Sequence, residues 1–223
     1  TGKEVPYEPH LAVTATPWPG TVACYTSAQD AGYQLNKLIP APSVIGETLS
    51  ILERASAGLW DRGAALRVKV AGGDLASAAM LDVLNGANVA SIGDGSSDNW
   101  EVFQFTEATL VAPDTYDLAL RLRGQAGRDA LMPDVWPIGS RFVLLDGAAV
   151  QPDLALSARG LARHYRIGAA ARPYDDPSYV HEGAAFQGIG PRPAVPCALG
   201  VPRAAGGAAD LRRAGRPGRA GRR

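Results

Sequence analysis

The feature that most constrains the fold of this chain is a set of short segments in which apolar and polar residues alternate. In residues 66–70, a leucine and two valines are separated by an arginine and a lysine. In residues 116–123, every second position is again apolar: Tyr116, Leu118, Leu120 and Leu122. A helix would scatter these side chains around its circumference, whereas a strand places them on one face. The alternation therefore predicts half-buried β-strands.

The abundance of helix-breaking residues indicates the same fold class. The 223 residues include 26 glycines and 17 prolines, which divide the chain into short segments separated by turns. We expect a mainly β fold, a short-stranded antiparallel sandwich or barrel-like module with one or two short helices. The best helix candidate lies near residues 74–85, where Asp74 can cap the first turn and Asn85-Gly86 can end the helix.

Further strands are expected in five segments: 21–26, 43–52, 99–111, 141–146 and 161–168. In residues 43–52, even spacing places Ile45, Leu49 and Ile51 on one side of the strand. The apolar run 141–146, which includes Phe142 and Leu144, is typical of a central strand bounded by glycines.

The two arginines that alternate with the leucines of 116–123 are expected to face solvent. Arg121 and Arg123 lie between the apolar positions, on the opposite face of the predicted strand. Gly124 and Gly127 would then form the turn that ends this strand. A phosphate-binding loop is the alternative, but the segment lacks the Lys-Ser/Thr of a P-loop and no convincing helix follows it.

No motif in the sequence identifies a catalytic, cofactor or metal site. The three histidines, His10, His164 and His181, have no metal-ligand spacing to one another or to the cysteines. Asp94, Ser96 and Asp98 alternate as in a calcium loop, but the glycine and glutamate of an EF-hand are missing, so a hairpin loop is favoured. We expect no catalysis, no cofactor and no tightly bound metal.

The net charge of zero conceals an uneven distribution. Residues 194–223 contain seven arginines and one aspartate, whereas the preceding 193 residues have six more acidic than basic side chains. An acidic body argues against specific nucleic-acid binding, and no apolar run approaches the ~20 residues of a membrane span. We expect residues 1–20 to form an extended N-terminal segment, residues 21–193 a β-rich module with room for two subdomains, and residues 194–223 a disordered basic tail.

The segments "YDLALRLRGQAGRD" and "GSRFVLLDGA" resemble a strand–loop–strand segment of phage tail-tip and baseplate-hub proteins. Longer stretches, such as "WPGTVACYTSAQDAGYQLN" and "SARGLARHYRIGAAARPYDDPSYVH", resemble the C-terminal region of the large host-specificity protein of alphaproteobacterial gene transfer agents. The resemblance extends over about residues 1–193. In residues 194–223, 24 of 30 residues are Ala, Gly, Arg or Pro, a composition that a frameshift in GC-rich DNA would produce.

The resemblance implies that the chain is a piece of a longer structural protein at the tail tip of a phage-like particle. The implied role is host attachment and DNA delivery through protein–protein contacts. The implied partners are other copies of the same hub chain, as a trimer in the particle, together with distal tail and tail-fibre or receptor-binding proteins. The resemblance implies no catalytic residue in this segment.

Two other functions stay open at this point. A carbohydrate- or receptor-binding β-module would use exposed aromatic side chains as stacking platforms, and the candidates are Trp18, Trp100 and Trp136. A fragment of a cell-wall glycan hydrolase would need two carboxylates roughly 5–10 Å apart in a cleft. Burial of the tryptophans would count against the first alternative.

Overall fold

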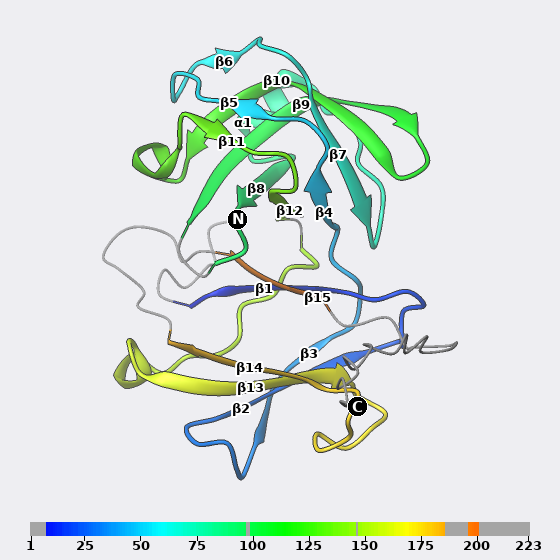
Figure 1. Ribbon diagram of the computed structural model, residues 1–223, viewed down its shortest axis with the longest axis vertical. Helices are drawn as coiled ribbons and strands as arrows, with labels where there is room; N and C mark the ends of the chain where they lie inside the picture. Colours follow the sequence, from blue (N-terminus) through cyan, green and yellow to red (C-terminus); the bar gives the residue numbers. More distant parts are fainter. Residues whose placement is uncertain (1–7, 97–98, 146, 186–195, 201–223) are drawn as a thin grey trace, which may run out of the picture.

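The computed structural model describes residues 8–96, 99–145, 147–185 and 196–200. The fold is mainly β, with 46% strand and 6% helix, which confirms the predicted class. A barrel occupies one end of the molecule and a four-stranded sheet occupies the other (Figure 1).

Six antiparallel strands form the closed barrel: β4 (Ile45–Thr48), β7 (Leu66–Ala71), β8 (Val89–Gly93), β9 (Trp100–Ala112), β10 (Thr115–Gln125) and β12 (Arg141–Leu144). Their order is β10-β7-β4-β12-β8-β9, and the pairing of β9 with β10 closes the ring. Three short strands that fall between the barrel strands in sequence lie outside the ring. Strand β6 (Trp60–Asp61) extends the sheet beside β10, and β5 (Leu52–Glu53) pairs with β11 (Val135–Trp136). Closure pairs the edges that an open sheet would leave free.

Apolar side chains fill the interior of the barrel. Strand β7 alternates buried and exposed residues along its whole length, as its sequence predicted. The buried cluster includes Leu66, Val68, Val70, Phe103, Phe105, Leu118 and Phe142, and Leu144 packs against it half-buried. The barrel is therefore a packed core, and Phe142 lies within it as expected for a central strand.

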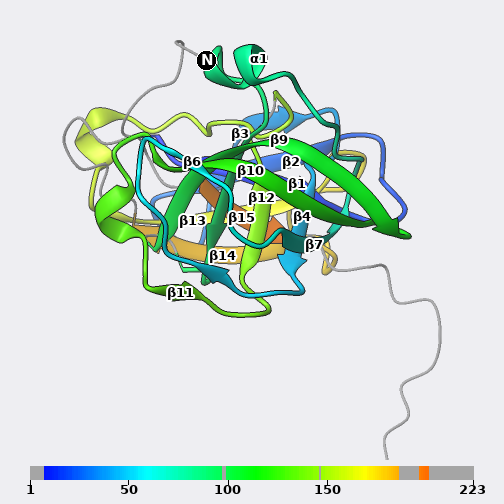
Figure 2. The ribbon, with the colours of Figure 1, turned by 90° about the horizontal axis from the view of Figure 1, so that it is seen from above.

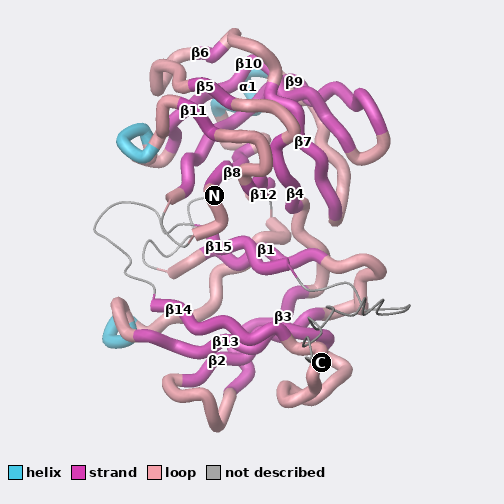
Figure 3. Tube along the Cα trace, in the orientation of Figure 1, coloured by secondary structure: helices cyan, strands magenta, loops and turns pink. Residues whose placement is uncertain are grey.

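The four-stranded sheet has the order β14-β13-β2-β3 and combines both ends of the described chain. Strands β2 (Val22–Ser27) and β3 (Gln34–Ile39) precede the barrel in sequence, whereas β13 (Ala162–Ala169) and β14 (Val180–Ala185) follow it. The barrel is therefore an insertion between the two halves of this sheet. Figure 3 shows the two groups of strands separated along the long axis.

Strand β1 (His10–Thr14) lies between the barrel and the four-stranded sheet (Figure 1). Its side chains at Leu11 and Val13 pack into the core of the four-stranded sheet. Ala12, which points to the opposite face, clusters instead with Trp100 and Val143 of the barrel. This single strand thus contacts the core of the four-stranded sheet with one face and a small cluster on the barrel with the other.

Strand β1 also pairs in parallel with β15 (Pro196–Gly200). This pairing corrects the expectation that residues 194–223 are disordered throughout, because the backbone of 196–200 forms a regular ladder. Residues 201–223 lie outside the described residues. The extended segment expected at 1–20 contains β1, a paired strand that contributes to the core of the four-stranded sheet and to the cluster of Ala12 with Trp100 and Val143.

Helix α1 (Met80–Leu84) is shorter than the helix expected over 74–85. The N-cap is Ala79 and has no side-chain hydrogen bond, so Asp74 does not cap the helix; its carboxylate accepts a hydrogen bond from the Tyr116 hydroxyl at 2.9 Å. The Ala78 N–H bonds the Thr106 carbonyl of β9 at 2.8 Å, which holds the preceding residues extended. Figure 2 shows α1 at the periphery. No helix in the described ranges is long and apolar enough to cross a membrane.

The predicted strand over 43–52 is interrupted, and its expected apolar face is wrong. Strand β4 ends at Thr48 and β5 begins at Leu52, so the residues between them form a bend. Leu49 and Ile51 are consequently 40% and 51% exposed. The side-chain hydroxyl of Thr48 donates to the Pro137 carbonyl at 3.0 Å, which fixes this bend against a neighbouring loop.

Two short 3₁₀ turns complete the described elements. They are η1 (Asp129–Leu131), which follows β10, and η2 (Leu156–Ala158), which precedes β13.

Candidate functional site

The two arginines of β10 are buried, which corrects the prediction that they face solvent. Arg121 is 1% exposed and Arg123 is 0% exposed. Leu120 adopts a φ of +51°, a left-handed conformation that interrupts the alternation of faces along the strand. Arg121 then lies opposite Phe105 of β9, whose ring belongs to the barrel core. Because paired residues of neighbouring strands share a face, Arg121 also points inward.

The leucine ladder is broken at the same residue. Leu118 and Leu122 are buried, but Leu120 is only half-buried. The predicted common face of the three leucines therefore ends at Leu118. Of the two glycines predicted to form the turn, Gly127 lies in the turn at 126–128, whereas Gly124 lies within β10; both have positive φ, at +71° and +61°.

Arg123 forms a bidentate ion pair with Glu101 of β9, and neither side chain is accessible to solvent. The Nε–Oε1 distance is 2.6 Å and the Nη2–Oε2 distance is 2.9 Å. The indole N–H of Trp136 donates to Oε2 at 2.7 Å, and the Gly124 N–H donates to Oε1 at 3.3 Å. Four donors therefore surround this carboxylate, which compensates for the loss of its hydration.

Asp61 of β6 connects the two arginines. Its Oδ2 accepts hydrogen bonds from Arg121 Nε at 3.1 Å and Nη2 at 2.9 Å, and it lies 3.4 Å from Arg123 Nη1. Burial alone would raise the pKa of Asp61, but donation from the Gly63 N–H and from Arg121 holds that pKa below its usual value. The four charged side chains thus neutralise one another inside the protein.

The candidate stacking tryptophans do not form a shared surface. Trp100 and Trp136 are 1% and 2% exposed, so neither offers a ring face to solvent. Trp18 is half-buried against the core of the four-stranded sheet, and its indole N–H donates to the Gly20 carbonyl at 2.8 Å. Burial of the two barrel tryptophans counts against the binding module that would have used them.

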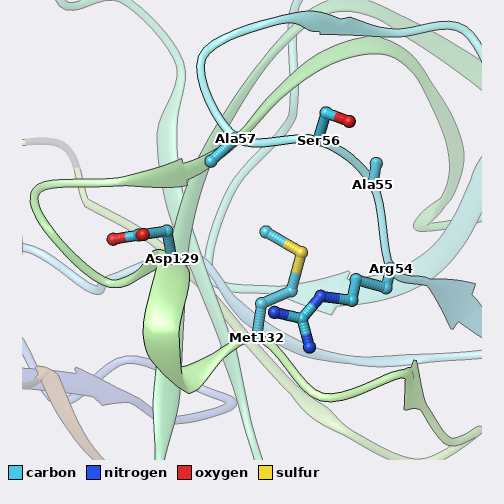
Figure 4. A pocket seen from close by; sticks show the side chains of 6 residues that line it. All are labelled: Arg54, Ala55, Ser56, Ala57, Asp129 and Met132. Atoms are coloured by element: carbon cyan, nitrogen blue, oxygen red, sulfur yellow. The ribbon is translucent and has the colours of Figure 1, made fainter.

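A pocket of about 530 Å³ lies between the segment that follows β5 and the η1 turn (Figure 4). Its described lining consists of Arg54, Ala55, Ser56, Ala57, Asp129 and Met132. The carbonyl of Glu53, the residue before the lining residue Arg54, accepts a hydrogen bond from Arg123 Nη1 at 2.8 Å. Asp129 is the one carboxylate in this described lining, whereas a glycosidase uses a pair. The pocket therefore offers no support for the hydrolase alternative.

The described loop of residues 94–96 and 99 joins β8 to β9, in agreement with the predicted hairpin. The Asp94 carboxylate accepts from the Ser96 N–H and the Asn99 side-chain amide, both at 2.8 Å. Asp98, the third residue of the calcium-like pattern, lies outside the described residues.

A second polar cluster on the four-stranded sheet was missed by the sequence analysis. His164 of β13 and His181 of β14 approach each other, with 3.2 Å between Nδ1 and Nε2. His181 Nε2 also lies 3.7 Å from Oδ1 of Asp30, in the loop between β2 and β3. The strand register explains the contact, because His164 is paired with Gly183 and His181 is two residues away on the same face. No local motif signals such a pairing.

Two side chains surround the Asp30 carboxylate. The Tyr33 hydroxyl donates to Oδ1 at 2.5 Å, and Arg166 Nη2 lies 3.3 Å from the same oxygen. The hydrogen bond from Tyr33 is the main cause that lowers the pKa of Asp30, and Arg166 and His181 add to it. Arg166 also lies over the Tyr33 ring, 4.8 Å from its centroid. These contacts hold the Asp30 carboxylate beside the histidines.

Comparison with known families matches the barrel segment of the chain. A family model described as "Rcc01698-like, C-terminal" matches residues 43–143. The match begins two residues before β4 and ends within β12, so it spans the closed barrel and little else. No curated protein matches the chain. The family name is that of a gene-transfer-agent-related protein, and residues 43–143 are similar to that family.

Proposed function

We propose that this chain is a structural part of the tail tip, or baseplate hub, of a gene-transfer-agent particle. It would act in host attachment and DNA delivery through contacts with other proteins. The observation that carries the proposal is the coincidence of the family match over 43–143 with one complete structural unit, the six-stranded barrel. The wider sequence resemblance to the host-specificity protein supports the same role.

The internal chemistry of the barrel suits a scaffold. Three charged side chains of the barrel, Glu101, Arg121 and Arg123, are buried and bonded to one another or to Asp61, so their charges are compensated within the fold. A catalytic group must instead reach a substrate. We therefore propose that the barrel catalyses no reaction and serves as a rigid support.

Exposed apolar side chains on the barrel offer surfaces for neighbouring subunits. Leu110 and Val111, near the exposed end of the β9–β10 hairpin, are 61% and 43% exposed. Leu81 and Leu84 of α1 also face outward. The partners that we propose for such surfaces are further copies of the hub chain in a trimer, the distal tail, and the fibres or receptor-binding proteins. Protein interfaces commonly bury apolar residues of this kind.

The proposal is tested in particles. Gold-labelled antibody against residues 43–143 should mark one end of the tail in electron micrographs. Deletion of the segment should abolish tail assembly or adsorption and leave capsids intact, and expression of the undeleted chain in the same cells should restore gene transfer. Particles that lack the barrel but still adsorb and deliver DNA normally would refute the tail-tip role.

A further inference from the structure

Three potential metal ligands converge on the outer part of the four-stranded sheet. They are His164, His181 and Asp30, and their ligand atoms all lie within 4.8 Å of one another. The residues come from β13, β14 and the β2–β3 loop, so the tertiary fold brings them together. All three are at least partly exposed, which leaves the group open to ions in solution.

The distances within the cluster fit a small cation with tetrahedral coordination. Ligands about 2.0–2.1 Å from a zinc ion at tetrahedral angles are separated from one another by about 3.3 Å. The two histidine nitrogens are 3.2 Å apart, and His181 Nε2 is 3.7 Å from Asp30 Oδ1. The ligand atoms of His164 and Asp30 lie within 4.8 Å of each other, so a cation bound to all three residues would draw them closer together.

The surroundings of the cluster orient its ligands and also place a competing positive charge beside one of them. His164 is paired with Gly183, where an added Cβ would lie 4.0 Å from the Nδ1 atom. Tyr33 donates to Asp30 Oδ1 and so fixes the orientation of the carboxylate, as groups behind metal ligands commonly do. Arg166 Nη2 lies 3.3 Å from the same Asp30 oxygen. The cation must therefore bind a carboxylate whose negative charge is already partly balanced by the guanidinium.

We propose that His164, His181 and Asp30 bind a divalent transition-metal ion of the zinc class. Two imidazoles and one carboxylate suit Zn²⁺ and Co²⁺ better than Mg²⁺ or Ca²⁺, which prefer oxygen ligands. Three protein ligands leave a fourth position for water or for a group from a neighbouring molecule. The ion would tie the β2–β3 loop to the β13–β14 hairpin, an interaction that the sequence analysis did not anticipate.

Metal titration of the full chain tests the site. We expect calorimetry to show one bound Zn²⁺ per chain, a melting temperature that rises with ZnCl₂ but not with MgCl₂, and visible absorption of a tetrahedral Co²⁺ complex. His181→Gln and Asp30→Asn should each weaken Zn²⁺ binding at least about tenfold. Asp175→Asn, at an exposed aspartate outside the cluster, is the matched control and should leave the affinity unchanged.

Removal of the Tyr33 hydroxyl, which orients the Asp30 carboxylate, gives a second test of Zn²⁺ affinity. Tyr33→Phe keeps the ring and all three ligands, and it should weaken Zn²⁺ binding by about tenfold. Circular dichroism establishes that each variant is folded, and Asp30→Asn decides the outcome if His181→Gln does not fold. The proposal is wrong if the chain binds no Zn²⁺, if Mg²⁺ gives the same stabilisation, or if folded ligand variants bind as tightly as the original chain.

Discussion

Replacement of Arg123 by alanine would leave a carboxylate buried without its counter-charge. Glu101 is 0% exposed, and Arg123 supplies two of its four hydrogen bonds, at 2.6 and 2.9 Å. The Trp136 indole and the Gly124 N–H would stay in place, but neither carries a charge. The perturbation therefore tests whether the ion pair of the barrel interior is required for stability.

The expected cost follows from the burial of the pair. Removal of one member of a buried ion pair destabilises a protein by about 3–5 kcal/mol. For a chain of this size, about 2–4 °C of melting temperature corresponds to 1 kcal/mol, so we expect a decrease of roughly 6–20 °C. Arg67 provides a matched control, because it forms a bidentate pair with Asp117 at 2.7 and 2.8 Å across neighbouring strands but is half exposed. Arg67→Ala should have a much smaller effect.

These free energies of unfolding are measured by urea denaturation and calorimetry of three proteins: Arg123→Ala, Arg67→Ala and the original chain. The double variant Glu101→Leu/Arg123→Leu adds a second comparison, because it removes both charges and should be less destabilised than Arg123→Ala. Equal losses for Arg123→Ala and Arg67→Ala would refute the reasoning, since burial would then make no difference to the contribution of the pair.

Other substitutions test the packing of the two cores. Leu118→Ala should cost about 2–5 kcal/mol in urea denaturation and Leu120→Ala clearly less, because only Leu118 is fully buried; equal costs would contradict the assigned faces. A Cβ at Gly46 would overlap a carbonyl group of β7, so Gly46→Ala should cost about 1–3 kcal/mol or more, whereas Gly147→Ala meets no atom within 4 Å and should change the melting temperature little. Burial raises the pKa of the Cys24 thiol to about 12. Mass spectrometry should therefore find Cys24 unmodified by iodoacetamide at pH 8 until urea unfolds the chain, and rapid modification of the folded protein would show that the thiol is accessible.

The sequence predicted strands best where one face of the strand is buried and the other is solvated. Residues 66–70 meet that condition, and β7 follows the predicted alternation. Strand β10 was also predicted, but the positive φ of Leu120 reverses the side-chain faces beyond it, and a leucine gives no warning of that conformation. The partners that make burial of Arg121 and Arg123 possible are distant in sequence, so local patterns could not reveal them.

Tertiary contacts explain the other differences. The segment before α1 had a helical pattern, but its hydrogen bond to β9 at Ala78 holds it extended. The cluster of His164, His181 and Asp30 depends on the register of β13 with β14 and on the position of the β2–β3 loop. Such a register can be inferred only once the strand order is known, which single-sequence patterns do not supply.

The insertion of the barrel has a consequence for the order in which the chain folds. Arg163 and Thr26, which meet across β13 and β2, are 137 positions apart in sequence. Val143 is paired with Ile45 at the two ends of the barrel segment. Once the barrel has folded, these residues are held side by side, so the loop that must close to pair β2 with β13 excludes most of the 137 positions. Shortening the loop about threefold lowers its closure entropy cost by about 1 kcal/mol. We therefore expect the barrel to form first and to act as the template on which the four-stranded sheet closes, so that barrel mutations slow the folding of both units.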